Sequence, residues 1–145
     1  MHRRTLGESL SAFDRDCQRL RASPALPCWL SSRPEGVRWM IFIAVKFKVK
    51  HEYADQWTDI VNDFTQATRS EPGNLWFEWS RSVDDPEEYV LLEAFKDDAA
   101  VPHVNSDHFA QFTSKAPDYL QETPQIRNTM LEGDDWERMS EITVA

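Results

Sequence analysis

Glycine is scarce in this chain, with only four in 145 residues. No Gly-rich loop of the kind that cradles a phosphate or a dinucleotide occurs, so the sequence predicts no flavin or nicotinamide cofactor. It also lacks a run of about 18 apolar residues, which excludes a membrane-spanning helix. The two cysteines, Cys17 and Cys28, lie near the N-terminus, which excludes a disulfide framework for the rest of the chain and favours free thiols in a cytoplasmic protein.

Basic residues are also in deficit: 16 Lys and Arg face 25 Asp and Glu, a formal net charge of −9. Phosphates of nucleic acids and anionic lipids would repel such a protein, so we expect no nucleic-acid partner and no membrane docking. The charge is uneven. Residues 1–39 hold seven Arg and four acids, a net of +3, and residues 40–145 hold nine basic and 21 acidic residues, a net of −12.

This break predicts three parts of the chain. Residues 1–39 form an N-terminal extension that is disordered or dispensable for folding, since unanchored termini are commonly so. Acidic residues interrupt what would otherwise resemble a signal peptide or transit peptide, and Met40 is an alternative start. Residues 40–132 form the folded domain, and residues 133–145 form a polar tail with Trp136 as its one anchor.

Alternating and helical hydrophobic patterns predict four strands and two helical regions within the domain. The helical region after the third strand is expected to begin at an Asp97 or Asp98 cap and to break at Pro102 and Pro117. In chain order, the expected elements are a strand over 40–50, a helix over 51–69, strands over 75–82 and 89–95, helical turns to about 119, and a strand over 123–131.

The order β-α-β-β-α-β is that of the ferredoxin-like α+β fold, a four-stranded antiparallel sheet with both helices on one face. The strands carry apolar side chains on both faces, among them Phe42, Trp76 and Leu92 on the face expected to lack helices. A broad apolar face left in water is unusual for a monomer, so the sequence predicts a homodimer that buries it sheet to sheet.

Chemistry-bearing side chains gather over residues 93–109, directly after the third strand. His103 and His108 are candidate bases, because a neutral imidazole can take a proton from a phenol or enol. The alternatives are a surface or capping role for His103, and a half-buried, hydrogen-bonded role for His108 beside Phe109. On one helix, a spacing of five places the rings on different sides, so no metal site of His103, Asp107 and His108 is predicted.

Other side chains have two interpretations each. Trp76 and Trp79 point to opposite faces of their strand, so at most one lines a given pocket, and either can be core. Glu93 lies in an otherwise apolar strand and is either a general base or the partner of Arg127 or Lys96.

The sequence also resembles the antibiotic biosynthesis monooxygenase superfamily over about residues 40–131. The resemblance is carried by Glu71-Pro72-Gly73, by Glu93-Ala-Phe95 running into Asp97-Asp98-Ala99, and by His103-x-x-Ser106-x-His108-Phe109. It implies a dimeric α/β-barrel protein, and its members include oxygenases that use no cofactor. Asn105 and Ser106 either polarise a substrate carbonyl or cap the next helical turn. The candidate catalytic residues are His103 and His108, and the candidate substrate-binding residues are Trp76, Trp79, Glu93, Phe95, Asn105, Ser106, Phe109 and Arg127.

The leading hypothesis is a monooxygenase that needs no cofactor and acts with O₂ on a quinol, phenol or polyketide-like aromatic molecule. The haem-degrading branch of the superfamily typically has an Asn on the first strand, and residues 40–50 contain none, so haem is a minor option. The alternatives are an isomerase of a phosphorylated carbonyl compound and a non-catalytic dimeric module that binds a ligand in a stress response. We expect that His103, near a helix break, can be replaced without harm to folding.

Overall fold

The computed structural model describes residues 36–144, so most of the predicted 1–39 extension lies outside the described residues. The elements differ from the expected ones mainly at their ends, and both helical regions consist of shorter pieces. In chain order they are β1 (Trp39–Lys48), the 3₁₀ helix η1 (His51–Gln56), α2 (Trp57–Ile60), α3 (Asn62–Arg69), β2 (Asn74–Arg81), β3 (Glu88–Lys96), α4 (Ala100–Val104), α5 (Asp107–Lys115), the 3₁₀ helix η2 (Ala116–Asp118) and β4 (Gln125–Glu132).

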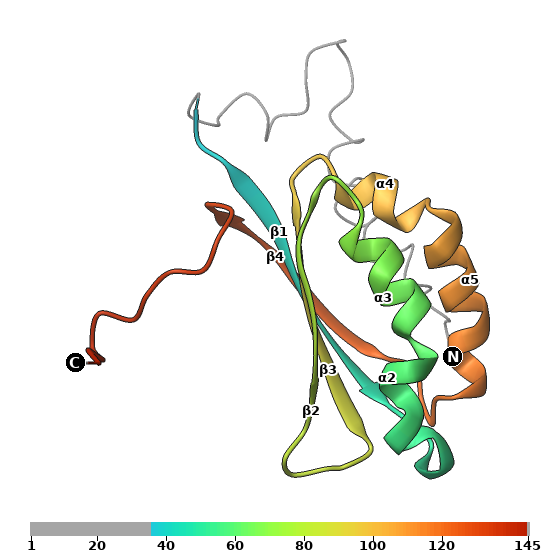
Figure 1. Cartoon of the computed structure of the whole chain (residues 1–145). Helices are drawn as coiled ribbons and strands as arrows, with labels where there is room; N and C mark the ends of the chain where they lie inside the picture. The colour runs from blue at the N-terminus through green and yellow to red at the C-terminus, as the bar shows by residue number, and fades with distance from the viewer. Residues whose placement is uncertain (1–35, 145) are drawn as a thin grey trace, which may run out of the picture. The chain divides into compact units, whose positions relative to one another are not determined.

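The four strands form one antiparallel sheet in the order β2-β3-β1-β4, and helices α2 to α5 all lie on one of its faces (Figure 1). This is the predicted ferredoxin-like α+β arrangement, and it is confirmed. The sheet of a single chain is open and not a closed barrel. Among the described residues, no helix is long and apolar enough to cross a membrane.

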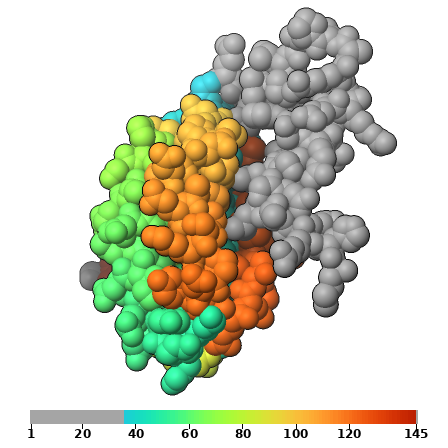
Figure 2. All heavy atoms as spheres, turned by 90° about the vertical axis from the view of Figure 1, so that its right-hand side faces the viewer, coloured from blue at the N-terminus to red at the C-terminus, as the bar shows by residue number. Residues whose placement is uncertain are grey.

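The core lies between the sheet and the helices. Alternate residues of β1 and β3, such as Val45 and Leu91, point to this side and are buried. Helices α3 and α5 lie side by side over the sheet (Figure 2), and the rings of Phe64 and Phe112 stack between them with centroids 4.2 Å apart. This contact lies in the first turn of α3 and sets the spacing of the two helices there.

Trp76 and Trp79 lie on opposite faces of the sheet, as predicted from their spacing. Trp79 is part of the core, where its indole Nε1 donates a hydrogen bond to Thr65 Oγ1 at 3.0 Å. Trp76 lies on the face without helices, 5.2 Å from the ring of Trp136. Trp136, which is 58% exposed, is therefore a residue of the C-terminal tail that contacts the sheet.

Of the two breaks predicted in the helical region after β3, the one at Pro117 is confirmed, since α5 ends at Lys115 and Pro117 lies in η2, and the one at Pro102 is wrong. Pro102 lies inside α4, where the first turn of a helix has no need of its N–H. The break falls at Asn105 and Ser106, between α4 and α5. The predicted Asp97 or Asp98 cap is also wrong, since Ala99 occupies the N-cap position of α4.

Gly73, in the turn before β2, lies against Ala99 at the start of α4. A Cβ atom placed on Gly73 would lie 2.0 Å from the Cβ of Ala99, which is well inside contact distance. We expect Gly73→Ala to lower the free energy of unfolding by about 1–3 kcal/mol, the usual cost of overpacking, as measured by urea denaturation. In the double variant with Ala99→Gly, most of this loss should be recovered. A Gly73→Ala variant as stable as the parent would contradict the close approach.

Candidate functional site

Two histidines from different helices, His103 of α4 and His108 of α5, lie next to the carboxylate of Glu71. Glu71 lies in the turn between α3 and β2, where its backbone N–H donates to Thr68 O at 3.0 Å. His103 Nδ1 lies 2.9 Å from Glu71 Oε1 and 3.2 Å from Oε2. His108 Nε2 lies 2.5 Å from the same Oε1. These three side chains therefore form one carboxylate–imidazole cluster, hereafter the Glu71 cluster.

The helix break explains why both rings reach the same carboxylate. Ser106 Oγ accepts the N–H of Phe109 at 3.2 Å and donates to His103 O at 2.7 Å, which ends α4 and starts α5 in a new direction. The expectation that a spacing of five separates the two rings assumed one continuous helix, and it is wrong for that reason. The capping role considered for Ser106 is confirmed.

His103 is buried, which rules out the alternative of a surface role. Its side chain is only 4% exposed, and its ring lies 4.6 Å from Phe95 and 5.1 Å from Phe109 by centroid. Burial lowers the pKa of His103, and the neighbouring Glu71 carboxylate opposes that shift. Replacing His103 therefore removes packing as well as an imidazole, so we no longer expect folding to be unaffected.

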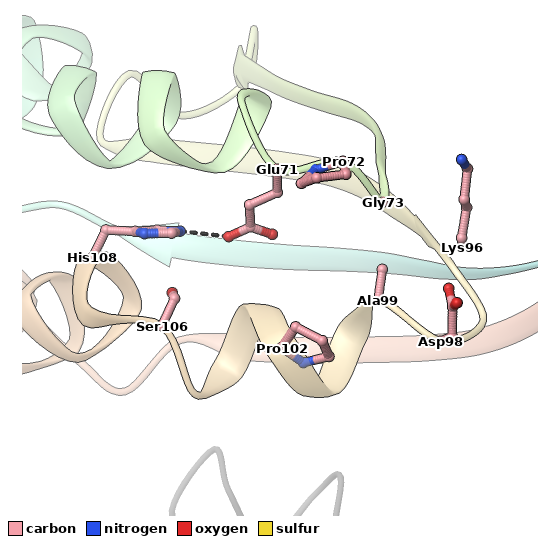
Figure 3. Close-up of a pocket in the computed structure, with 9 residues that line it drawn as sticks. All are labelled: Glu71, Pro72, Gly73, Lys96, Asp98, Ala99, Pro102, Ser106 and His108. Carbon is pink, nitrogen blue, oxygen red and sulfur yellow. Dashed lines mark hydrogen bonds and ion pairs between the residues drawn. The ribbon is translucent and has the colours of Figure 1, made fainter.

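A pocket of about 420 Å³ opens beside this cluster (Figure 3). Glu71 points from its turn toward His108, and both side chains line the pocket wall together with Ser106. Lys96 and Asp98 lie toward the other end of the pocket. His108 is 26% exposed, so a ligand in the pocket can reach its ring. The nearly buried His103 contacts the Glu71 carboxylate from the core side.

Glu93 is a second carboxyl group on the helix-covered face. Its cross-strand neighbours are Ile43 and Phe77, both buried, and its Oε2 atom has no hydrogen-bond partner among the described residues. Burial, and to a smaller extent the charge of Glu71, raises the pKa of Glu93 to about 8. Glu93 is therefore mostly protonated at neutral pH.

The proposed pairing of Glu93 with Arg127 or Lys96 is wrong. Arg127 lies opposite Ala44, on the other face of the sheet, and Lys96 at the end of β3 lines the pocket; among the described residues neither forms an ion pair with Glu93. Arg127 lines a separate pocket of about 480 Å³ with Ala44, Lys46, Gln125 and Ile126.

The remaining candidates divide between the core, the surface and the open face of the sheet. Phe95 and Phe109 contact His103 from the core. Asn105 is exposed, and its side-chain amide donates to Val101 O at 2.9 Å. Trp79 lies in the core, and Trp76 and Arg127 lie on the open face. Of the predicted set, His103, His108, Phe95, Ser106 and Phe109 lie around the Glu71 cluster, and Glu93 is close enough for the charge of Glu71 to act on it.

Glu71 is the residue that the sequence analysis did not place in the site. Its signal was present, since it begins the Glu71-Pro72-Gly73 string that carries the family resemblance. What the pattern could not show is that this turn lies next to the α4–α5 break, about 30 residues further along the chain.

Comparison with known proteins agrees with the fold. The family model described as "Antibiotic biosynthesis monooxygenase" matches residues 40–115, which contain all three members of the Glu71 cluster. The chain belongs to this family. Within it, the chain is 29% identical over 93 residues to the "Putative monooxygenase YcnE" of Bacillus subtilis (strain 168), a match that covers 63% of this chain and 98% of that protein.

Solved structures of the same fold include two from other bacteria. A "Putative antibiotic biosynthesis monooxygenase from Nitrosomonas europaea" is 25% identical, with a TM-score of 0.57 over 65% of this chain and 89% of that chain. Rv0793 from Mycobacterium tuberculosis has a TM-score of 0.57 at 19% identity, over 68% of this chain and 99% of that chain, and supports the fold alone. The family membership makes monooxygenase chemistry the first activity to consider.

Proposed function

We propose that this protein is a monooxygenase that oxidises a quinol or a similar electron-rich phenol with O₂ and needs no redox cofactor. The observation that supports this best is the hydrogen bond between His108 and Glu71 at the wall of a pocket. An imidazole held by a carboxylate is a common general base, because the carboxylate fixes the tautomer and stabilises the imidazolium that forms.

In the proposed reaction, a quinol and O₂ give a hydroxyquinone and water. One oxygen atom enters the ring, the other leaves as water, and the quinol supplies all four electrons, so no external reductant is required. The first step is loss of a phenolic proton to His108. The resulting anion is a far better electron donor to O₂ than the neutral phenol.

His108, Glu71 and His103 have different roles in this proton transfer. With its Nε2–H donated to Glu71, His108 keeps Nδ1 as the proton acceptor. His103 donates from Nδ1 to the same carboxylate and holds it in place from the core side. The apolar surroundings of Phe64, Phe95 and Phe109 exclude water from this side of the cluster, which strengthens its electrostatic interactions.

The test is O₂ uptake by the full chain after dialysis against EDTA, with a panel of quinols and polyketide-like phenols. We expect consumption of one O₂ per quinol and formation of the hydroxyquinone, detected by mass spectrometry with ¹⁸O₂. A panel that gives no uptake above the rate of spontaneous oxidation, or uptake only after a flavin is added, would contradict the proposal.

We also propose that the open face of the sheet is covered by a second copy of the chain. Leu92 lies near its centre, between Ala44 and Glu78 on the neighbouring strands, and Trp76 and Phe42 extend the apolar surface. Sedimentation velocity should show a dimer for the parent and a monomer for Leu92→Lys, because a charge there is costly to bury. Val83→Lys, at a hairpin position that is 99% exposed, is the matched control and should stay dimeric. A monomeric parent at micromolar concentration would refute this proposal.

A further inference from the structure

The Glu71 cluster also brings together three atoms that can bind a metal ion. Glu71 offers a carboxylate oxygen, His103 offers Nδ1 and His108 offers Nε2, and these atoms all lie within 4.8 Å of one another. Two imidazoles and one carboxylate are the ligands that Zn²⁺ and other first-row divalent ions take in open sites. In the part of the chain that the structure describes, this is the one group of three such side chains that converges.

The two distances from the Glu71 carboxylate are near those that a metal ion needs, and the two imidazole nitrogens, which lie within 4.8 Å of each other, have to move closer. With bonds of about 2.0–2.2 Å, neighbouring ligands of a tetrahedral ion lie about 3.3 Å apart. Glu71 Oε2 and His103 Nδ1 already lie 3.2 Å apart. The 2.5 Å contact between Glu71 Oε1 and His108 Nε2 has to lengthen, and the partly exposed His108 is the ring with room to move.

The neighbouring pocket and the buried position of His103 also favour binding of a metal ion. Glu71 and His108 line the 420 Å³ pocket, which gives an entry path and leaves one side of the cluster open to water or a ligand. His103 is held by the core, so one ligand is already in position before an ion binds.

We propose that Glu71, His103 and His108 form a binding site for a divalent transition-metal ion of the Zn²⁺ or Co²⁺ type. The ion takes the place of the two hydrogen bonds that now join the imidazoles to the carboxylate. Among the described residues, His51 and Glu87 form another His–Glu pair. This pair has only one imidazole, and its carboxylate also contacts Lys48, so it lacks the second imidazole that the Glu71 cluster has.

The site has a consequence that rests on the proposed function. A metal ion on His108 Nε2 requires the neutral imidazole to carry its proton on Nδ1, the atom proposed to accept the substrate proton. Binding of the ion therefore removes the base. We expect micromolar Zn²⁺ to suppress quinol oxidation reversibly, so that EDTA restores it.

The binding test does not depend on activity. Co²⁺ is titrated into the full chain with Cys17→Ser and Cys28→Ser, which removes thiolate ligands, and the visible d–d absorption of cobalt is followed together with calorimetry. We expect one tightly bound Co²⁺ per chain, with the intense bands of a tetrahedral or five-coordinate site, displaced by Zn²⁺.

Variants assign the ligands. His108→Ala and Glu71→Gln should weaken Co²⁺ binding by more than about 100-fold, since loss of an outer-shell partner alone costs about 10–100-fold. Circular dichroism checks that each variant is folded, and His51→Ala is the matched control that should bind as the parent does. Binding that is absent, or that is equally strong in His108→Ala, would overturn the proposal and leave the cluster as a hydrogen-bonded triad. Metal binding without quinol oxidation would refute only the proposed function, and oxidation without metal binding would refute only this inference.

Discussion

His108→Ala is expected to lower kcat/KM for quinol oxidation by about 10²–10⁴-fold, the usual contribution of a general base. The loss should appear mainly in kcat, because the imidazole takes up the proton as the reaction proceeds and contributes little to binding the neutral quinol. Steady-state O₂ uptake at saturating and limiting quinol separates the two parameters. His108 is 26% exposed and lies in the first turn of α5, so its replacement should leave the fold intact.

Two further variants distinguish this role from a general effect on the pocket. Glu71→Gln keeps the shape of the side chain but removes the charge that stabilises the imidazolium, so it should also reduce kcat. His51→Ala removes an exposed histidine that contacts Glu87 and should leave kcat unchanged. A His108→Ala enzyme as fast as the parent would eliminate His108 as the base.

Glu93→Gln is expected to stabilise the protein by several kcal/mol at pH 8–9. The pKa of Glu93 is raised from its ordinary value of 4.5 to about 8 in the folded chain, so the folded state keeps a proton that the unfolded state has lost. Stability of the parent therefore falls as pH rises from about 4.5 to 8, by up to about 1.4 kcal/mol per pH unit, and is flat above this range. The glutamine variant lacks this dependence, since its side chain does not titrate.

Urea denaturation of both proteins at several pH values between 4 and 9 measures the effect. The difference in free energy of unfolding between the variant and the parent should be smallest near pH 4 and largest above pH 8. Glu122→Gln, at an exposed position in the loop before β4, is the control and should give a nearly constant difference. A constant difference for Glu93→Gln as well would mean that Glu93 is solvated or paired in the folded protein.

Part of the candidate site was predictable because it is local in the sequence. His103, Ser106, His108 and Phe109 lie within seven residues, and any compact arrangement of that segment after β3 keeps them together. Glu71 was not placed with them because its partners are 32 and 37 residues away. Only the packing of α3 against α5, and of the turn after α3 against the start of α4, brings them into contact.

The errors about burial have the same origin. The polar types of His103 and Glu93 left open a surface role for the first and a paired charge for the second, whereas their positions on the core side of α4 and β3 bury both. Residue type indicates whether a side chain is usually buried or exposed, but it does not show which residues pack against that side chain. Arg127 illustrates the same point, since one residue of strand register decides its face.

The sequence alone determined the element order, the α+β fold, the opposite faces of Trp76 and Trp79 and the segment that carries the histidines. These follow from hydrophobic periodicity and turn residues, which act over a few positions of the chain. Tertiary structure alone decided that Glu71 joins His103 and His108, that Glu93 is buried without a partner, and that Arg127 faces away from them. Each of these depends on which distant segments pack together, a property of the folded chain that no local pattern contains.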